Sequence, residues 1–195
     1  MAKQVWKPGN MLYPLPAVLV SVGDMEKNNL FTVAWTGTVC TNPAMVYISV
    51  RPERYSYEII EKKREFVINL TTKDLLKAVE YCGVRSGRDV DKWKEMRLTP
   101  VESQKVKAPS LLESPVNIEC KVVKIDKLGS HHMFIAKVVS VSVEDELLDS
   151  KGGFHLDEAD LIAYSHGDYV TTGKKIGSFG FSVKRKKRSK GTTRR

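Results

Sequence analysis

Residues 29–60, with the sequence NLFTVAWTGTVCTNPAMVYISVRPERYSYEII, decide the fold that we predict for this chain. Apolar residues alternate with small or polar ones from Phe31 to Trp35, the period-two pattern of a half-buried strand. The strand is expected to break at Thr36, where a polar turn begins that contains an Asn-Pro pair at 42–43 and leads to a second strand at 45–50. The segment therefore predicts a β-hairpin whose second strand runs into a pair of arginines.

Hydroxyl and guanidinium groups gather around this hairpin. Thr36, Thr38 and Ser56 supply hydroxyls, and Arg51 and Arg54 supply lasting positive charge. A phosphate dianion needs several oriented donors, and guanidinium offers a fork of them. Ser56 is also the predicted N-cap of the short helix that follows, whose free amides would favour an anion. The pattern predicts a site for a flat, phosphorylated ligand; the alternative is an ordinary hairpin with two solvated arginines.

The spacing of further strand patterns indicates a barrel. Strands are predicted at residues 17–22, 30–35, 45–50, 65–70, 116–125 and 132–143. One helix is predicted from Thr72, as its cap, to Gly83, and a shorter one contains Val90 and Trp93. Residues 100–115 carry prolines without a regular pattern, so they are predicted to form an active-site loop or an excursion toward a dimer partner.

A Rossmann fold is excluded. No G-x-G-x-x-G opens a helix, and the strands do not alternate with regular crossover helices. A nicotinamide nucleotide is therefore expected only as a visiting substrate. For the same reason, no ribose-reading motif separates NADH from NADPH.

The composition is that of one domain. The chain has 195 residues, 42% of them hydrophobic, which is enough for a proper core. No run approaches the roughly 20 apolar residues that span a bilayer, and the first residues have no apolar signal core, so we expect a cytoplasmic protein without membrane contact. Cys40, Cys82 and Cys120 are far apart in the sequence, which indicates buried free thiols and neither a disulfide framework nor a metal site.

The basic character of the chain is concentrated at one end. The net charge is +9, but residues 184–195 hold eight lysines and arginines and no acid, which leaves only +1 for residues 1–183. We therefore predict a domain over 1–183 and a disordered basic tail over 184–195. Weak contacts of the tail with RNA or anionic surfaces are the alternative.

Several separate motifs occur in an order that one family shares. They are residues 13–21, 29–37, 54–60 and 66–70, then Asp91-Lys92-Trp93, a glycine-histidine hairpin with its strand at 129–138, and a closing segment with Tyr164, Gly167 and Tyr169. These motifs resemble the flavin reductase-like family, the FMN-binding split barrels that include flavoredoxin. The resemblance covers nearly all of residues 10–183 and implies a mainly β, Greek-key split barrel with a few short helices. Ser130 and Ala136 depart from it, because the family often has an acid and a glycine there.

The resemblance implies an FMN site along the opening hairpin. The phosphate would lie against Thr38, Arg51, Arg54 and Ser56, and residues 35–39 would follow one edge of the flavin. The full set that we assign to FMN is Trp35, Thr36, Gly37, Thr38, Val39, Ser49, Val50, Arg51, Arg54, Tyr55, Ser56, Asn69 and Leu70. Asn69 can donate and accept hydrogen bonds, which suits flavin or ribityl oxygens, or it forms a strand-end turn. Trp35 either stacks beside the ring or belongs to the core.

His131 is the predicted catalytic residue. It follows a glycine turn, where the family places a histidine near the nicotinamide or the pyrimidine edge of the flavin, to orient or polarise. The alternative is a solvent-exposed turn histidine. His131 and His132 are poor evidence for a metal, because neighbouring strand side chains point to opposite faces. Tyr164 and Tyr169 either close the site or pack at a dimer interface.

The resemblance implies an FMN-dependent oxidoreductase. It would take electrons from NADH or NADPH and pass them to free flavin, ferric iron or a protein acceptor, so the protein mainly has to stack two rings. A homodimer with FMN pockets at the subunit interface is expected. One alternative is an electron-carrier flavoprotein that resembles flavoredoxin and has no NAD(P)H turnover of its own. The other is an RNA-binding barrel that uses the basic tail.

Overall fold

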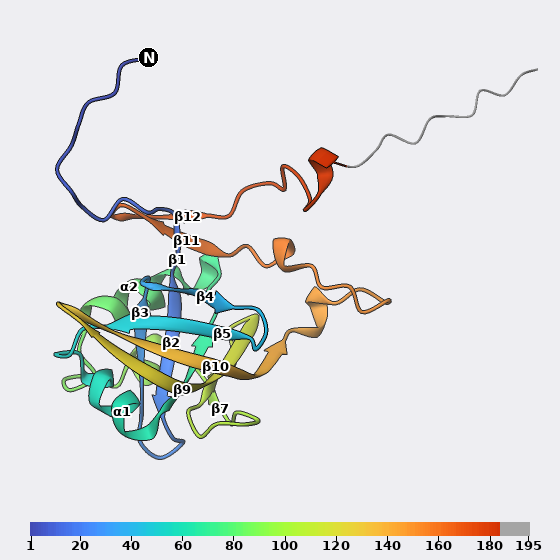
Figure 1. Ribbon diagram of the computed structural model, residues 1–195. Coiled ribbons are helices and arrows are strands. Elements are labelled where there is room, and N and C mark those ends of the chain that lie inside the picture. Colours follow the sequence, from blue (N-terminus) through green and yellow to red (C-terminus); the bar gives the residue numbers. More distant parts are fainter. Residues whose placement is uncertain (184–195) are drawn as a thin grey trace, which may run out of the picture.

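A seven-stranded antiparallel sheet forms the body of the protein in this computed structural model, which describes residues 1–183 (Figure 1). Its order is β3-β2-β6-β9-β10-β5-β4. The strands are β2 (Val18–Gly23), β3 (Asn28–Val33), β4 (Thr36–Cys40), β5 (Met45–Val50), β6 (Glu65–Asn69), β9 (Val116–Leu128) and β10 (His131–Val143). The predicted mainly β, split-barrel fold is confirmed. The predicted basic tail, 184–195, lies outside the described residues.

Two small sheets and a few short helices complete the fold. Strands β1 (Leu15–Pro16), β11 (Ile162–Ser165) and β12 (Asp168–Thr171) form a three-stranded sheet, and β7 (Pro100–Val101) pairs with β8 (Ser110–Leu111). The helices are α1 (Tyr55–Lys63), α2 (Leu76–Val84) and α3 (Lys92–Met96), with 3₁₀ turns at Lys73–Leu75, Asp145–Leu147, Leu156–Glu158 and Phe181–Val183. Among the described residues, no helix is long and apolar enough to cross a membrane.

Strand β2 is buried on both faces. Val18, Val20 and Val22 point into the main core, together with residues of the other barrel strands and of α1. Ala17 and Leu19 point the opposite way, as alternation along a strand requires, and pack with residues of α2 and α3. These two helices therefore cover the outer face of β2 and β3 (Figure 1).

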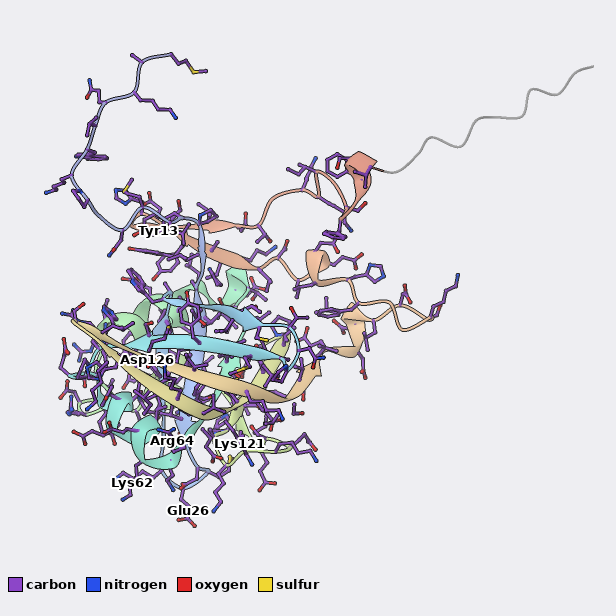
Figure 2. The ribbon with its side chains drawn as sticks, in the orientation of Figure 1. Tyr13, Glu26, Lys62, Arg64, Lys121 and Asp126 are labelled. Carbon is purple, nitrogen blue, oxygen red and sulfur yellow. The ribbon has the colours of Figure 1, made fainter. Side chains whose placement is uncertain are left out.

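The surface opposite the three-stranded sheet is charged. Glu26 and Lys62 are exposed, and their side chains point away from the body at that end (Figure 2). Tyr13 lies at the other end, where its ring contacts that of Tyr164 edge-on at 5.9 Å. The polar end and the aromatic end of the molecule are thus separated by the barrel.

The chain continues as a strand where we predicted a turn. Residues of β4 pair with β5, for example Thr36 with Ile48, so the turn lies further on, after Cys40. The Thr36 hydroxyl donates to the backbone oxygen of Tyr47 at 2.6 Å. The predicted polar turn from Thr36 onward is wrong, because this hydroxyl stabilises strand pairing.

The predicted helices exist with different ends. Helix α1 has Arg54 at its N-cap position, so the predicted cap Ser56 is wrong; Ser56 is buried inside the first turn. Helix α2 runs through Gly83 to Val84. Helix α3 begins after Asp91, whose carboxylate accepts from the backbone N–H groups of Trp93 and Lys94 at 3.1 and 3.2 Å, and so leaves Val90 outside.

Residues 100–115 pack against the barrel. The buried carboxylate of Glu119 accepts hydrogen bonds from the backbone N–H groups of Gln104, Lys105 and Val106, at 2.9, 2.6 and 3.2 Å. A buried charge with several donors is stable in this way, and it fixes a segment that has little pairing of its own. None of its residues lines the two cavities described below, and the two alternatives for this segment, an active-site loop or an excursion toward a dimer partner, stay predictions.

All three cysteines are free. Cys82 and Cys120 are buried as expected, whereas Cys40 is half-buried on β4. Burial raises the pKa of the Cys82 thiol to about 11 and raises that of Cys120 further. Both buried thiols are therefore protonated and unreactive at neutral pH.

Candidate functional site

Two adjoining cavities lie beside β3, α2 and the three-stranded sheet. One, of about 380 Å³, is lined by Trp35, His131, Tyr164 and Tyr169, and we name it the aromatic cavity. The other, of about 280 Å³, we name the basic cavity; its cations are Arg51, Arg54, Arg85, Arg88 and Lys92. The two share Phe31, Arg51, Arg54 and Val84, so one elongated ligand can occupy both.

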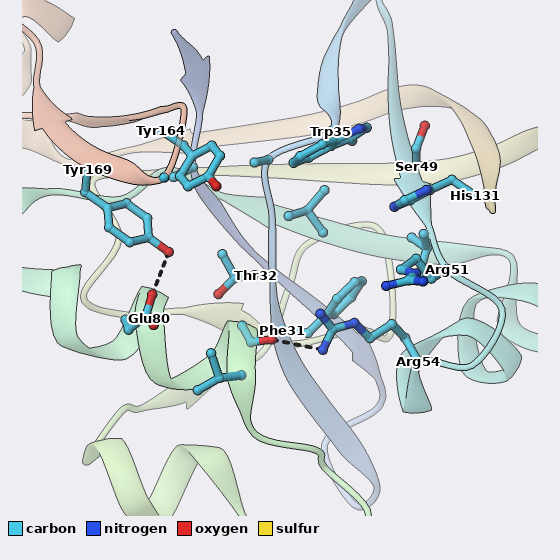
Figure 3. Close-up of a pocket in the computed structure, with 17 residues that line it drawn as sticks. Phe31, Thr32, Trp35, Ser49, Arg51, Arg54, Glu80, His131, Tyr164 and Tyr169 are labelled. Atoms are coloured by element: carbon cyan, nitrogen blue, oxygen red, sulfur yellow. Dashed lines mark hydrogen bonds between the residues drawn. The ribbon is translucent and has the colours of Figure 1, made fainter. Parts of the chain in front are cut away.

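Four rings line the aromatic cavity, two of them parallel to each other. The rings of Trp35 and His131 are parallel, with centroids 6.0 Å apart and an interplanar angle of 4°. Tyr164 lies 6.5 Å from Trp35 and contacts Tyr169 edge-on at 5.6 Å. Figure 3 shows these four side chains around the cavity, with Arg51 and Arg54 to one side. Rings arranged in this way suit a planar ring system.

His131 is neutral at neutral pH. Its pKa is lowered from its ordinary value by burial and then by the positive charge of Arg51, with a smaller contribution from Arg54. A neutral imidazole has one N–H donor and one acceptor. At the edge of the aromatic cavity, His131 can therefore orient a polar ring edge without adding a charge.

A hydrogen bond closes the opposite side of the aromatic cavity. The Tyr169 hydroxyl of β12 donates to Oε2 of Glu80 on α2 at 2.9 Å (Figure 3). Burial and this hydrogen bond raise the pKa of Tyr169 to about 12, so the phenol keeps its proton. The three-stranded sheet is thereby tied to α2 across the cavity, and of the two alternatives for Tyr164 and Tyr169 the structure supports a place in the site.

Lys92 brings a buried positive charge to the basic cavity. It is 3% exposed, and its ammonium donates to the backbone oxygen of Cys82 at 2.9 Å. Burial lowers the pKa of Lys92 to about 8. Among the described residues it makes no ion pair, since the salt bridges there involve other cations. A buried cation without an anion is costly, so this cavity favours an anionic ligand.

The remaining cations of the basic cavity are held by backbone and aromatic groups. Arg54 donates to the oxygen of Gly83 at 2.9 Å, as Figure 3 shows, and Arg88 donates to the oxygen of Glu53 at 3.1 Å. The Arg88 guanidinium also lies over the ring of Tyr55, 5.6 Å from its centroid. Within residues 1–183, Arg51 is the one cation of this cavity that pairs with a carboxylate, that of Glu53 at 2.9 Å. Most of the positive charge is thus free for a ligand.

Gly87 brings the loop between α2 and α3 close to the barrel. A Cβ atom at this position would lie 2.2 Å from Oδ1 of Asn29. Asn29 in turn donates to the Ser56 hydroxyl at 2.7 Å. Only glycine allows this approach, which brings Arg85, Ser86 and Arg88 to the cavity.

A comparison with known families assigns the chain. A family model described as the flavin reductase like domain matches residues 11–173. The chain belongs to the flavin reductase like family. Membership indicates a flavin-related oxidoreductase or electron carrier and confirms the resemblance seen in the sequence.

Similar proteins support the same family. An uncharacterized protein of Pyrococcus abyssi is 32% identical over 166 residues, 85% of this chain and 95% of that protein. One of Archaeoglobus fulgidus is 36% identical over 140 residues, 72% of this chain and 78% of that protein. The structure of flavoredoxin from Desulfovibrio vulgaris (Miyazaki F) has a TM-score of 0.87 and 26% identity, over 94% of this chain and all (100%) of that one. Flavoredoxin from Methanosarcina acetivorans gives 0.82 and 25%, over 94% and 100%.

Many of the residues predicted for the flavin meet in this member of the family. The aromatic cavity contains Trp35, Ser49, Val50, Arg51, Arg54 and His131. The basic cavity contains Arg51, Arg54, Tyr55 and Ser56. The alternatives of a purely core Trp35 and a fully solvated His131 are therefore not supported, because both side chains line a cavity.

Six predicted residues lie outside both cavities: Thr36, Gly37, Thr38, Val39, Asn69 and Leu70. The first four form most of β4, the edge strand of the sheet, where Thr38 and Val39 are exposed. Leu70 packs against the main core. The structure does not bring these residues to either cavity.

Asn69 is a structural residue in this flavin reductase-like chain. It is fully buried; its Nδ2 donates to the oxygen of Leu19 at 2.9 Å and to the Ser21 hydroxyl at 3.1 Å. Its Oδ1 accepts from the backbone N–H of Leu111 at 3.0 Å and from Asn117 at 2.9 Å. Every donor and acceptor position of Asn69 thus serves to join strands, and its contact with the flavin stays a prediction.

The sequence analysis did not assign Lys92 to the site and missed several other polar lining residues, among them Glu80, Arg85, Ser86 and Arg88. The last three stand in the run Arg85-Ser86-Gly87-Arg88 directly after a helix. Two arginines around a serine and a glycine are an anion-binding signal that was present in the sequence. Glu80 carried no such signal, because its role depends on the distant Tyr169.

Replacing Arg51 by glutamine should raise the pKa of His131, because it removes a positive charge that lowers this pKa. The measurement is a pH titration of the His131 imidazole resonances by NMR. Lys121→Gln, an exposed change of equal charge on β9, should leave that pKa unchanged. An unchanged His131 pKa in the Arg51 variant would contradict the electrostatic link between the two cavities.

Proposed function

We propose that this protein binds FMN, with the isoalloxazine ring in the aromatic cavity and the phosphate in the basic cavity. The observation that carries the proposal is Lys92, a buried ammonium whose hydrogen bond is to a backbone oxygen. A phosphate dianion supplies the missing negative charge there. Arg51 and Arg54 line both cavities and so lie where the chain between ring and phosphate passes.

The protein's contribution to catalysis is orientation and a fixed electrostatic environment. When bound, FMN supplies a ring that accepts a hydride from a reduced nicotinamide and passes electrons on. Trp35 and Tyr164 exclude water from one wall, and neutral His131 orients a polar ring edge. The arginines stabilise negative charge that develops nearby.

We propose that the protein is an NADH- or NADPH-dependent oxidoreductase that delivers electrons to free flavin, ferric iron or a protein acceptor. Family membership supports flavin-related redox chemistry. The similarity to two flavoredoxins supports the second candidate, an electron carrier without its own nicotinamide turnover. The RNA-binding alternative depends on residues 184–195, outside the described part of the chain, and stays a prediction.

We also propose a homodimer, on the evidence of the terminal segments. Trp6 is 75% exposed, Phe179 106% and Phe181 66%, and Figure 1 shows both segments reaching away from the body. Soluble monomers rarely expose so many large apolar side chains together. Three covered aromatic side chains contribute about 150–250 Å² each, a large part of the roughly 800 Å² per partner in a standard interface.

Replacing Lys92 by methionine should weaken FMN binding roughly 10- to 150-fold, as expected for one charge-assisted hydrogen bond of about 1.5–3 kcal/mol. Quenching of flavin fluorescence measures the dissociation constants. Riboflavin, which lacks the phosphate, should bind the variant and the wild type almost equally. Lys94→Met, on the exposed side of the same helix, is the matched control. Equal losses for FMN and riboflavin would contradict the phosphate assignment.

Without an acceptor, anaerobic addition of NADH or NADPH should bleach the flavin band of the FMN-loaded protein, because each bound FMN takes up one hydride. With an acceptor, which reoxidises the flavin, the absorbance of the reduced nicotinamide should fall over many turnovers per site. A flavin band that resists both nucleotides but bleaches with dithionite would identify the electron carrier instead.

Light scattering of the purified protein should give twice the 22.0 kDa chain mass. Replacing Phe179 and Phe181 by serine should shift the mass toward that of one chain, because it removes apolar contacts of the C-terminal segment. A wild-type protein with the mass of a single chain would contradict the dimer.

A further inference from the structure

Two adjacent histidines at the start of β10 serve opposite faces of the sheet. His131 lines the aromatic cavity, whereas the ring of His132 packs edge-on against Tyr57 of α1, with centroids 5.3 Å apart. Nδ1 of His132 lies 2.7 Å from the Tyr57 hydroxyl oxygen. Any rotation of the strand that moves one ring moves the other, because successive strand side chains share one backbone.

Tyr57 joins this histidine to the arginine-bearing turn. Its side chain is buried in the main core, where it also packs edge-on against Phe134 at 5.3 Å. Its backbone N–H donates to the oxygen of Arg54 at 2.9 Å, and Arg54 is the N-cap residue of α1. On the strand side, His132 pairs with Val50, which precedes Arg51. Both ends of the contact therefore lead directly to cavity residues.

The Tyr57–His132 hydrogen bond exceeds what burial of the phenol requires. The Tyr57 hydroxyl also donates to Oε1 of Glu61 at 3.2 Å, which already satisfies its single proton. While the phenol proton points to Glu61, the phenol oxygen accepts a hydrogen bond from the Nδ1–H of His132. A buried tyrosine needs one partner to avoid an unsatisfied donor, and here it has a second one on the strand that carries His131.

We propose that Tyr57 and His132 are positioning residues, whose hydrogen bond sets the place of His131 relative to the turn with Arg51 and Arg54. The bond is partly buried at the edge of the main core, and reduced contact with water strengthens a hydrogen bond. It thereby fixes the spacing between the ring end and the phosphate end of the site. The identity of the ligand rests on the proposed function, whereas the position of His131 does not.

The test compares Tyr57→Phe, which removes the hydroxyl and keeps the ring, with Tyr81→Phe as the matched control. Tyr81 is on α2, lines neither cavity, and its hydroxyl makes no hydrogen bond among residues 1–183. In the ligand-free protein, Tyr57→Phe should shift the His131 imidazole resonances and their titration by NMR. With ligand, it should raise the dissociation constant for FMN at least fivefold and that for riboflavin less, because only FMN engages both ends. Tyr81→Phe should match the wild type.

His132 provides a second pair of variants if Tyr57→Phe does not fold. His132→Gln keeps a side-chain N–H donor, whereas His132→Phe has none. The His131 resonances and the FMN affinity of His132→Gln should therefore differ less from the wild type than those of His132→Phe. A role in stability alone would lower the melting temperature without moving the His131 resonances, and that outcome would overturn the proposal. An affinity for FMN equal to that of the wild type, in variants that have lost the Tyr57–His132 hydrogen bond, would also overturn the proposal.

Failure of the two proposals can be told apart. A wild-type protein that binds neither FMN nor riboflavin overturns the proposed function before any variant is made. The His131 resonances of the ligand-free protein then decide alone whether Tyr57 positions that ring. Unchanged resonances in Tyr57→Phe and in both His132 variants overturn the inference, whatever the protein binds.

Discussion

The burial of β2 on both faces is the constraint on which the rest of the structure depends. Its valines enter the barrel core, and Ala17 and Leu19 on the other face require a cover that α2 and α3 provide. The buried amide of Asn69 fixes this arrangement by joining β2 to β8 and β9. Because α2 and α3 are held there, the loop between them brings its cations to the cavities, and the buried Lys92 lines the basic cavity. The site is therefore a consequence of how the barrel covers its central strand.

Charge is divided along the two cavities in a way that orients a ligand. Five cations gather at the basic cavity, and the side of the aromatic cavity formed by α2 and β12 carries Glu80 and Tyr169. A ligand with one anionic end has a single favourable direction in such a field. The lowered pKa of His131 follows from the same charges, since an imidazolium beside Arg51 would be repelled. The cations of the basic cavity thus favour one direction of ligand binding, and Arg51 and Arg54 among them also contribute to the lowered pKa of His131.

Local sequence patterns predicted the barrel strands, the helices and the arginine pair, because each depends on neighbours in the sequence. Alternation located β2, β3 and β5 closely, and Arg51 and Arg54, which were selected for their charge, both line the two cavities. Patterns failed where distant contacts decide. Thr36 looked like a turn residue but stabilises β4 through the oxygen of Tyr47, and the hydrogen bonds by which Asn69 joins four strands were not predicted. The place of Glu80 in the site could not be predicted from local sequence, since its hydrogen-bond partner Tyr169 is 89 residues away.

The most direct test of the account is the electron density of crystals grown with FMN. We predict the phosphate against the ammonium of Lys92 in the basic cavity, and the ring in the aromatic cavity beside Trp35 and His131. Phosphate density away from Lys92, or a ring in the basic cavity, would contradict the central claim that a buried lysine without an anion marks the phosphate site.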